Sequence, residues 1–244
     1  MRQTRTDIMG MPIVLDVPKG RQEDLDAVFD YFAGIDRRFS TYKKDSEISR
    51  INRGEATELS TQMQEVFAIA EATRKQTGGF FNMRRSDGLL DPSGIVKGWA
   101  LHGAAELLRA RDITDFYIDA GGDIQTSGLN AQGQPWRIGI RSPFVHSDII
   151  KIIEPHGAGV ATSGSSARGA HIWNPHAPGE ELEEILSITV VGPNVLEADR
   201  FATAAFAMGR RGIEFIEALP GFEGYNINRN GLATQTSGFS RYTL

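Results

Sequence analysis

Residues 187–209 of the 244-residue chain read SITVVGPNVLEADRFATAAFAMG. The β-branched segment Ser187–Val191 is typical of a strand, and Gly192-Pro193-Asn194 breaks it. Apolar residues then recur at helical spacing from Leu196 to Met208, and Gly209 is a typical helix stop. The stretch therefore predicts a strand, a tight break and a helix in direct succession.

The predicted helix carries an acid and a hydroxyl near its start. Asp199 and Thr203 are four residues apart, so their side chains lie on the same face of a helix. Two oxygen ligands on a first turn can hold a hard cation against a phosphate. A structural interpretation is also open, because the helix dipole favours an early acid and a mid-helix threonine is ordinary. The pair supports a cation site only in combination with other segments of the chain.

Helices and short strands occupy the remaining sequence. Apolar periodicity, caps and glycine stops predict helices around 25–35 and over 45–52, 61–76, 93–110 and 212–219. Alternating β-branched segments predict strands over 9–17, 116–120, 136–141, 149–154, 160–162, 188–191 and 225–228. Most of these strands follow one another as hairpins, which predicts an α+β fold in a single domain over 1–244.

Composition excludes several classes of protein. With 40% hydrophobic and 23% charged residues, the chain has the composition of an ordinary globular protein. The formal net charge of -5 and the isolated pairs Arg37-Arg38, Arg84-Arg85 and Arg210-Arg211 argue against a nucleic-acid partner. Without cysteine there are no disulfides, thiolate nucleophiles or cysteine metal sites.

Targeting signals are also missing from the sequence. The first eight residues contain no apolar signal-peptide core, and a lipobox cysteine is absent. No stretch approaches the roughly 18–20 apolar residues of a membrane span. These features predict a cytoplasmic protein.

Three further loop segments carry residues suited to phosphate or ligand binding. In residues 91–100 a helix opens from a Pro-Ser-Gly turn, so its free amides and Lys97 suit a phosphate. In residues 118–124 a strand enters a double glycine before Asp123, which allows close approach of a ligand. Hydroxyls at Thr162 and Ser163 precede the titratable His171. Each segment alone also fits an ordinary helix start, turn or structural histidine.

Taken in order, these segments resemble the ApbE-like FAD:protein FMN transferases. The resemblance covers about residues 9–231. It rests on Phe39-Ser40-x-Tyr42 with residues 46–52, Thr77-Gly78-Gly79-Phe80-Phe81, residues 91–98, Gly121-Gly122-Asp123-Ile124, Thr162-Ser163-Gly164, His171-Ile172-x-Asn174-Pro175 and Ala198-Asp199-x-x-Ala202-Thr203.

The resemblance implies helices packed on mixed, largely antiparallel sheets with an FAD cleft. It also implies transfer of FMN from FAD to a threonine or serine hydroxyl of an acceptor protein, with Mg²⁺ at the pyrophosphate and release of AMP. The implied metal ligands are Asp199, Thr203 and the carbonyl of Gly94, and we assign His171 as the general base. The implied FAD contacts are Met9, Tyr42, Phe80, Phe81, Asn82, Asp91, Lys97 and a strand at 171–173 that includes Trp173. Asp123, Thr162 and Ser163 are expected to line the same cleft.

Departures from the family pattern leave alternatives open. The family's Gly-Ala-Phe-Asp stands here as Gly79-Phe80-Phe81-Asn82, so an acid is lost and a bulky ring replaces a small residue. Asn174 replaces the usual acid before proline, and the loop before His171 is short. The metal chemistry could instead use water as acceptor, which would make the protein an FAD pyrophosphatase. The third alternative is a flavin-binding protein without catalysis.

Overall fold

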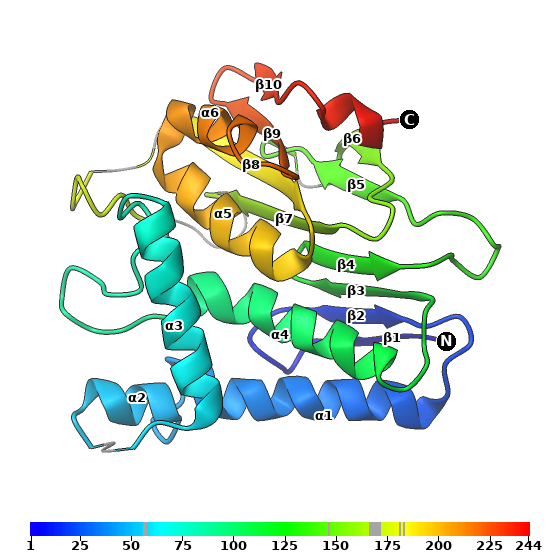
Figure 1. Ribbon diagram of the computed structural model, residues 1–244, viewed down its shortest axis with the longest axis horizontal. Helices are drawn as coiled ribbons and strands as arrows, with labels where there is room; N and C mark the ends of the chain where they lie inside the picture. The colour runs from blue at the N-terminus through cyan, green and yellow to red at the C-terminus, as the bar shows by residue number, and fades with distance from the viewer. Residues whose placement is uncertain (56–57, 146, 166–171, 181, 183) are drawn as a thin grey trace.

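The computed structural model describes residues 1–55, 58–145, 147–165, 172–180, 182 and 184–244. Its centre is an eight-stranded sheet in the order β1-β2-β3-β4-β7-β8-β9-β10, beside a two-stranded sheet of β5 and β6 (Figure 1). The strands are β1 Arg2–Arg5, β2 Ile13–Asp16, β3 Phe116–Ala120, β4 Asp123–Ser127, β5 Ile138–Arg141, β6 Ile149–Ile153, β7 Gly159–Gly164, β8 Ile185–Gly192, β9 Glu223–Asn228 and β10 Ala233–Gln235. Each described strand pair is antiparallel.

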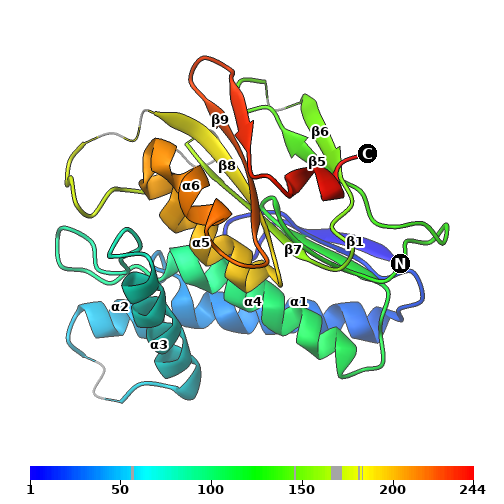
Figure 2. The same cartoon turned by 45° about the horizontal axis from the view of Figure 1, so that its top comes forward.

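The helices lie on one side of the large sheet (Figures 1 and 2). They are α1 Gln22–Phe39, α2 Glu47–Asn52, α3 Thr61–Gln76, α4 Ser93–Arg109, α5 Val195–Ala207 and α6 Gly212–Glu217. α1 and α4 share an apolar core with β2 and β3, whereas α5 packs on β7 and β8, and α6 packs on α5 and β9. α2 and α3 pack on the other helices rather than on the sheet. Among the described helices, none combines the length and apolar character that crossing a membrane requires.

The opposite face of the large sheet carries a third apolar cluster. Ile138, Ile140 and Ile153 of the small sheet pack there with Phe239 from the C-terminal segment. Along β8, Val190 packs on the helical side and Val191 on this side, as the two-residue period of a strand requires. The sheet therefore has apolar layers on both faces.

The predicted α+β class with largely antiparallel sheets is confirmed, but three strands were missed. β1 is a charged, largely exposed edge strand, and β10 is exposed and polar, so neither has the alternating pattern of a half-buried strand. β4 also lacks an alternating apolar pattern, because Gln125 and Thr126 are polar although both are buried; Gln125 Nε2 donates to the Gly157 carbonyl at 2.9 Å. The strand predicted over 9–17 is shorter, because Met9 and Gly10 adopt positive φ angles before β2 begins.

The start of α5 is fixed by two polar side chains. The Asn194 side chain accepts a hydrogen bond from the Glu197 amide at 3.0 Å, and Gln125 Oε1 accepts one from the Val195 amide at 2.9 Å. Both contacts satisfy amides that a helix start leaves without an intrahelical partner. This capping sets where Asp199 and Thr203 lie.

Loss of this cap gives a first testable prediction. Asn194→Ala should lower the free energy of unfolding by about 1 kcal/mol, the usual cost of an N-cap side chain. Ser60→Ala is the matched control, since Ser60 caps α3 in the same way by accepting from the Met63 amide at 3.2 Å. Urea unfolding measures both, and an unchanged stability of Asn194→Ala would contradict the role of the cap.

Candidate functional site

Two glycines of α4 let that helix approach α5 closely. A Cβ on Gly98 would lie 2.7 Å from Asp199 Cβ and 3.0 Å from Leu196 Cα. A Cβ on Gly94 would lie 3.0 Å from the Phe81 ring and 3.3 Å from the Thr203 methyl. The Gly98 amide donates to Asp199 Oδ2 at 2.8 Å, although in a regular helix it would donate to the Gly94 carbonyl. The three implied metal-ligand residues, Gly94, Asp199 and Thr203, thus meet at one helix contact.

Two buried carboxylates share the ammonium of Lys97. Asp123 and Asp199 are 0% and 2% exposed, and Lys97 Nζ lies 2.6 Å from Asp123 Oδ2 and 3.8 Å from Asp199 Oδ1. Asp123 Oδ1 also accepts from the Thr162 amide at 3.0 Å, which ties β4 to β7. The trio of Lys97, Asp123 and Asp199 therefore carries an excess of negative charge when both acids are ionised.

This burial changes the titration of Asp199. Desolvation is the main cause that raises its pKa from 3.8 to about 8; the nearby Asp123 raises it too, while Lys97 and the Gly98 amide lower it. The ionised form of Asp199 is therefore costly in the protein without a bound cation.

The raised pKa predicts a pH-dependent gain in stability when the acid is removed. Because the folded pKa exceeds the unfolded one, the contribution of Asp199 to stability is present below the unfolded pKa and is lost as the pH rises through the folded pKa. Asp199→Asn should therefore raise the thermal midpoint of the metal-free protein more near pH 8 than near pH 4. Thermal melts in chelator at both pH values test this. An equal rise of the thermal midpoint at pH 4 and at pH 8 would contradict it.

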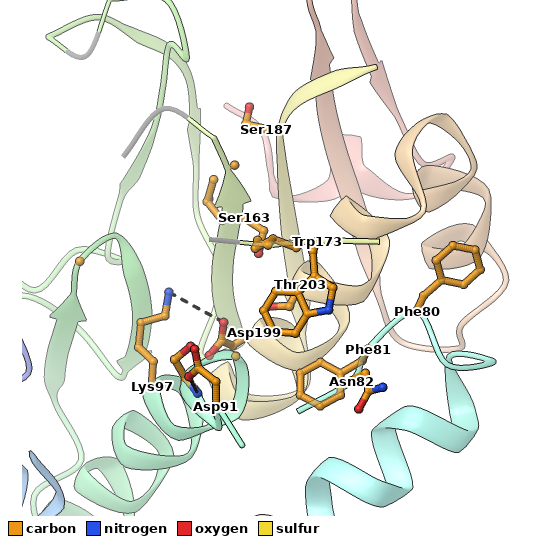
Figure 3. Close-up of a pocket in the computed structure, with 16 residues that line it drawn as sticks. Phe80, Phe81, Asn82, Asp91, Lys97, Ser163, Trp173, Ser187, Asp199 and Thr203 are labelled. Atoms are coloured by element: carbon orange, nitrogen blue, oxygen red, sulfur yellow. Dashed lines mark hydrogen bonds and ion pairs between the residues drawn. The ribbon is translucent and has the colours of Figure 1, made fainter. Parts of the chain in front are cut away.

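A cavity lies over this helix contact (Figure 3). Its lining comes from several segments that are distant in sequence: Phe80, Phe81, Asn82, Asp91, Ser93, Gly94, Lys97, Gly121, Thr162, Ser163, Gly164, Ile172, Trp173, Ser187, Asp199 and Thr203. Lys97 and Asp199 point toward each other at one end, whereas Phe80 lies away from them at the other (Figure 3). The cavity thus has a charged end and an aromatic end.

A second cavity adjoins the first at the start of α4. Its lining includes Met9 and Tyr42, and it shares Asp91, Ser93 and Lys97 with the first cavity. The Tyr42 side chain is 95% exposed at its rim. The α4 N-terminus therefore stands between two neighbouring cavities.

The aromatic end is built by the segment that leaves α3. The Thr77 hydroxyl accepts from the Phe81 amide at 3.1 Å, which holds the turn that presents Phe80, Phe81 and Asn82. On the outside, the His176 ring lies edge-on to Phe80 with centroids 4.6 Å apart, and its Nε2 is 3.0 Å from the Gly78 carbonyl oxygen. We call Phe80, Phe81 and Asn82 the aromatic wall.

Most residues predicted for the site come together here. The first cavity gathers Phe80, Phe81, Asn82, Asp91, Gly94, Lys97, Thr162, Ser163, Trp173, Asp199 and Thr203. Asp123 lies beneath it and reaches it through Lys97 and the Thr162 amide, while Met9 and Tyr42 line the adjoining cavity. Ile172 and Trp173 are not in a strand, contrary to the prediction for 171–173. His171 lies outside the described residues.

Ser187 lines the cavity but was not predicted as a site residue. It is paired with Gly164, the last residue of the motif Thr162-Ser163-Gly164, in the register of β8 against β7. Only that strand register brings Ser187 to the cavity, and the sequence offers no separate signal for it.

The donor set at the helix contact fits a hard cation that also binds phosphate. Within the described ranges, no three acidic, histidine or cysteine side chains gather into a metal site. One carboxylate, one hydroxyl and one carbonyl are instead the few protein oxygens that Mg²⁺ takes when substrate phosphates and water supply the rest. The excess negative charge beside Lys97 supports the same interpretation.

The sequence of this chain matches a known protein family over most of its length. The ApbE family profile matches residues 9–87 and 82–225. The chain belongs to the ApbE family.

Several relatives of this ApbE-family chain have assigned activities. It is 28% identical to the FAD:protein FMN transferase of Vibrio cholerae over 244 residues, 75% of this chain and 73% of that protein. It is 24% identical to the Haemophilus influenzae FAD:protein FMN transferase over 282 residues, 88% of this chain and 81% of the relative. The match to the Salmonella typhimurium transferase, at 27% identity, spans 75% of this chain but only 53% of that protein.

Solved ApbE structures show the same fold. The flavin transferase ApbE from Vibrio cholerae superposes with a TM-score of 0.85 at 24% identity, over 99% of this chain and 98% of that one. The ApbE protein from Thermotoga maritima gives a TM-score of 0.87 at 20% identity, over 100% and 99% of the two chains.

Proposed function

We propose that this protein transfers FMN from FAD to a threonine or serine hydroxyl of an acceptor protein and releases AMP. The observation that carries the proposal is the meeting of Asp199, Thr203 and Gly94 beneath a cavity that opens at the N-terminus of α4. The names of the relatives support the same activity. The proposal treats residues 1–244 as one domain.

Mg²⁺ would be held by Asp199, Thr203 and the Gly94 carbonyl. When bound, it would neutralise charge on the pyrophosphate and on the departing AMP. A Cβ at position 94 would lie 3.0 Å from the Phe81 ring and 3.3 Å from the Thr203 methyl, so a side chain there would require one of these groups to shift.

We propose that FAD spans the two adjoining cavities. FAD has a ring system at each end of a pyrophosphate, and the cavities meet at the start of α4, where free amides and Lys97 suit phosphate oxygens. Pro92 supplies no side-chain cap to this helix, although Asp91 accepts from the Ser93 amide at 3.1 Å. We place the pyrophosphate at the start of α4, with one ring against the aromatic wall and the other beside Met9 and Tyr42.

The reaction replaces the phosphoanhydride bond of FAD by a phosphoester bond to the acceptor. The acceptor hydroxyl oxygen forms a bond to the phosphorus of the FMN half, and the bond from that phosphorus to the bridging oxygen breaks with AMP as leaving group. The hydroxyl proton passes to a base. The sequence predicts His171 for this role. Lys97 adds positive charge beside the phosphates.

A cytoplasmic location of the protein also stays a prediction of the sequence.

The test follows FAD turnover with and without an acceptor. The purified protein is incubated with FAD and Mg²⁺, and the probe acceptor is the protein that the Vibrio cholerae transferase modifies, with that transferase as positive control. AMP formation that depends on the acceptor, with covalent flavin fluorescence on it in a denaturing gel, is expected. AMP formation without acceptor would show a pyrophosphatase, and FAD binding with neither product would show a flavin-binding protein.

Metal removal is the second arm of this test. A chelator should stop AMP formation, and excess Mg²⁺ should restore it, because the phosphate charge is otherwise uncompensated. Turnover that continues at the full rate in chelator would contradict the proposed metal site.

A further inference from the structure

We infer that Arg200 is a positioning residue for FAD, which sets the aromatic wall relative to the Asp199–Thr203 helix. The inference rests on the proposed function, since it concerns how the same cavity holds FAD. Arg200 directly follows Asp199 on α5, and its side chain is only 9% exposed. A guanidinium is rarely buried this far unless it is fully paired.

Arg200 bonds to two elements at once. Its Nε and Nη2 lie 3.0 and 2.5 Å from the Glu197 carboxylate oxygens on its own helix. Its Nη1 donates to Thr73 Oγ1 at 3.1 Å and to Gln76 Oε1 at 2.5 Å, both in the last turn of α3. Because the guanidinium is planar and rigid, these bonds fix the end of α3 against α5.

The end of α3 in turn holds the aromatic wall. The Thr77 amide and hydroxyl both donate to the Thr73 carbonyl, at 2.9 and 2.8 Å, and Thr77 Oγ1 accepts from the buried Phe81 amide. The Phe81 ring then packs where a Cβ on Gly94 would be 3.0 Å away. The contacts therefore form a circuit from α5 through α3 and the wall to Gly94, which faces Thr203 on α5.

The circuit predicts a specific kinetic signature. If Arg200 only stabilised the fold, its loss would reduce the fraction of active protein and leave FAD affinity unchanged. If it positions the wall, FAD should bind more weakly while the phosphate chemistry at saturating FAD is retained. Such a change raises KM for FAD with little effect on kcat.

The experiment measures FAD affinity by quenching of flavin fluorescence, in chelator so that the metal site does not contribute. Arg200→Met should raise the Kd for FAD about tenfold, equivalent to about 1.4 kcal/mol. With Mg²⁺ and acceptor, its kcat should stay within about threefold of wild type. The matched control is Arg74→Met, which removes an exposed α3 arginine that pairs with Glu71 at 2.8 Å and should leave Kd unchanged.

A second variant tests the circuit itself. Thr77→Val removes the hydroxyl that accepts from the Phe81 amide, so it should weaken FAD binding about five- to tenfold by itself. Because Arg200 and Thr77 act on the same wall, the double variant should bind FAD within about twofold of Arg200→Met alone. If Arg200→Met does not fold, Gln76→Ala replaces it beside Thr77→Val. The Kd for FAD of that double variant should then lie within about twofold of the Kd of the weaker-binding single variant.

The outcomes separate this inference from the proposed function. Wild-type protein that binds no FAD would overturn the proposed function. Wild-type protein that binds FAD, with Arg200→Met binding equally well in a folded state, would overturn the inference alone. Effects of Arg200→Met and Thr77→Val that multiply in the double variant would also overturn it.

Discussion

Replacement of Asp199 by asparagine is expected to reduce FMN transfer by about a hundred- to thousandfold, the usual cost of losing a preorganised charge partner of the transition state. The substitution removes the one anionic oxygen that α5 offers to the cation, while asparagine can still accept from the Gly98 amide. The fold should therefore persist, and the loss should lie in the chemistry. AMP release with FAD, Mg²⁺ and acceptor measures it.

Two controls make this prediction specific. Thr203→Val removes a neutral ligand of the same set and should cost less than Asp199→Asn, since a hydroxyl compensates no charge. Metal-free Asp199→Asn should be at least as stable as wild type, because a desolvated carboxyl with a raised pKa has been removed. Full activity of Asp199→Asn at ordinary Mg²⁺ concentration would show that the cation site is elsewhere.

Gly98→Ala is expected to destabilise the contact between α4 and α5. Alanine normally favours a helix interior over glycine by about 1 kcal/mol. Here the added carbon would meet Asp199 Cβ at 2.7 Å and Leu196 Cα at 3.0 Å, and the latter is backbone that moves only with the whole helix. Overpacking of this kind costs about 1–3 kcal/mol, so the net effect is destabilising. Displacement of α5 should also lower transfer activity.

The control for this prediction is a helical glycine with space around it. In α1, a Cβ on Gly34 would have only the end of the Arg37 side chain nearby, at 3.9 Å. Gly34→Ala should therefore stabilise the protein by up to about 1 kcal/mol. Urea unfolding and AMP release of both variants give the comparison. A Gly98→Ala protein as stable and active as Gly34→Ala would mean that the α4–α5 contact is looser than the structure shows.

The sequence predicts the parts of the site that depend on residues close together in the chain. Asp199 and Thr203 share a helix face because helices have a fixed period, and the segment at 91–98 reads as a helix start because of its turn residues. The resemblance to the family then orders these segments around one ligand. The helix contact that joins them depends on Gly98 meeting Asp199, 101 residues apart in sequence, which no local pattern reveals.

The missed features have a common physical cause. Gln125 and Thr126 are polar and give no apolar alternation, yet they lie buried in β4, where Gln125 Oε1 accepts from the Val195 amide at the start of α5. Phe239 is fully buried although its segment is polar, because it packs on the far face of the large sheet. In the sequence Arg200 resembles an ordinary surface charge of a helix, and only the structure shows that it bonds to Thr73 and Gln76. Tertiary contacts decide each of these, and they override local propensity.

The most direct test of the central claim is the intact mass of the acceptor after incubation with FAD and Mg²⁺. The account predicts that wild-type protein adds one FMN, less water, to a threonine or serine of the acceptor, with one AMP released for each acceptor modified. The Asp199→Asn protein should leave the acceptor mass unchanged over the same time. An acceptor that keeps its mass while wild-type protein releases AMP at the same rate with and without it would contradict the claim.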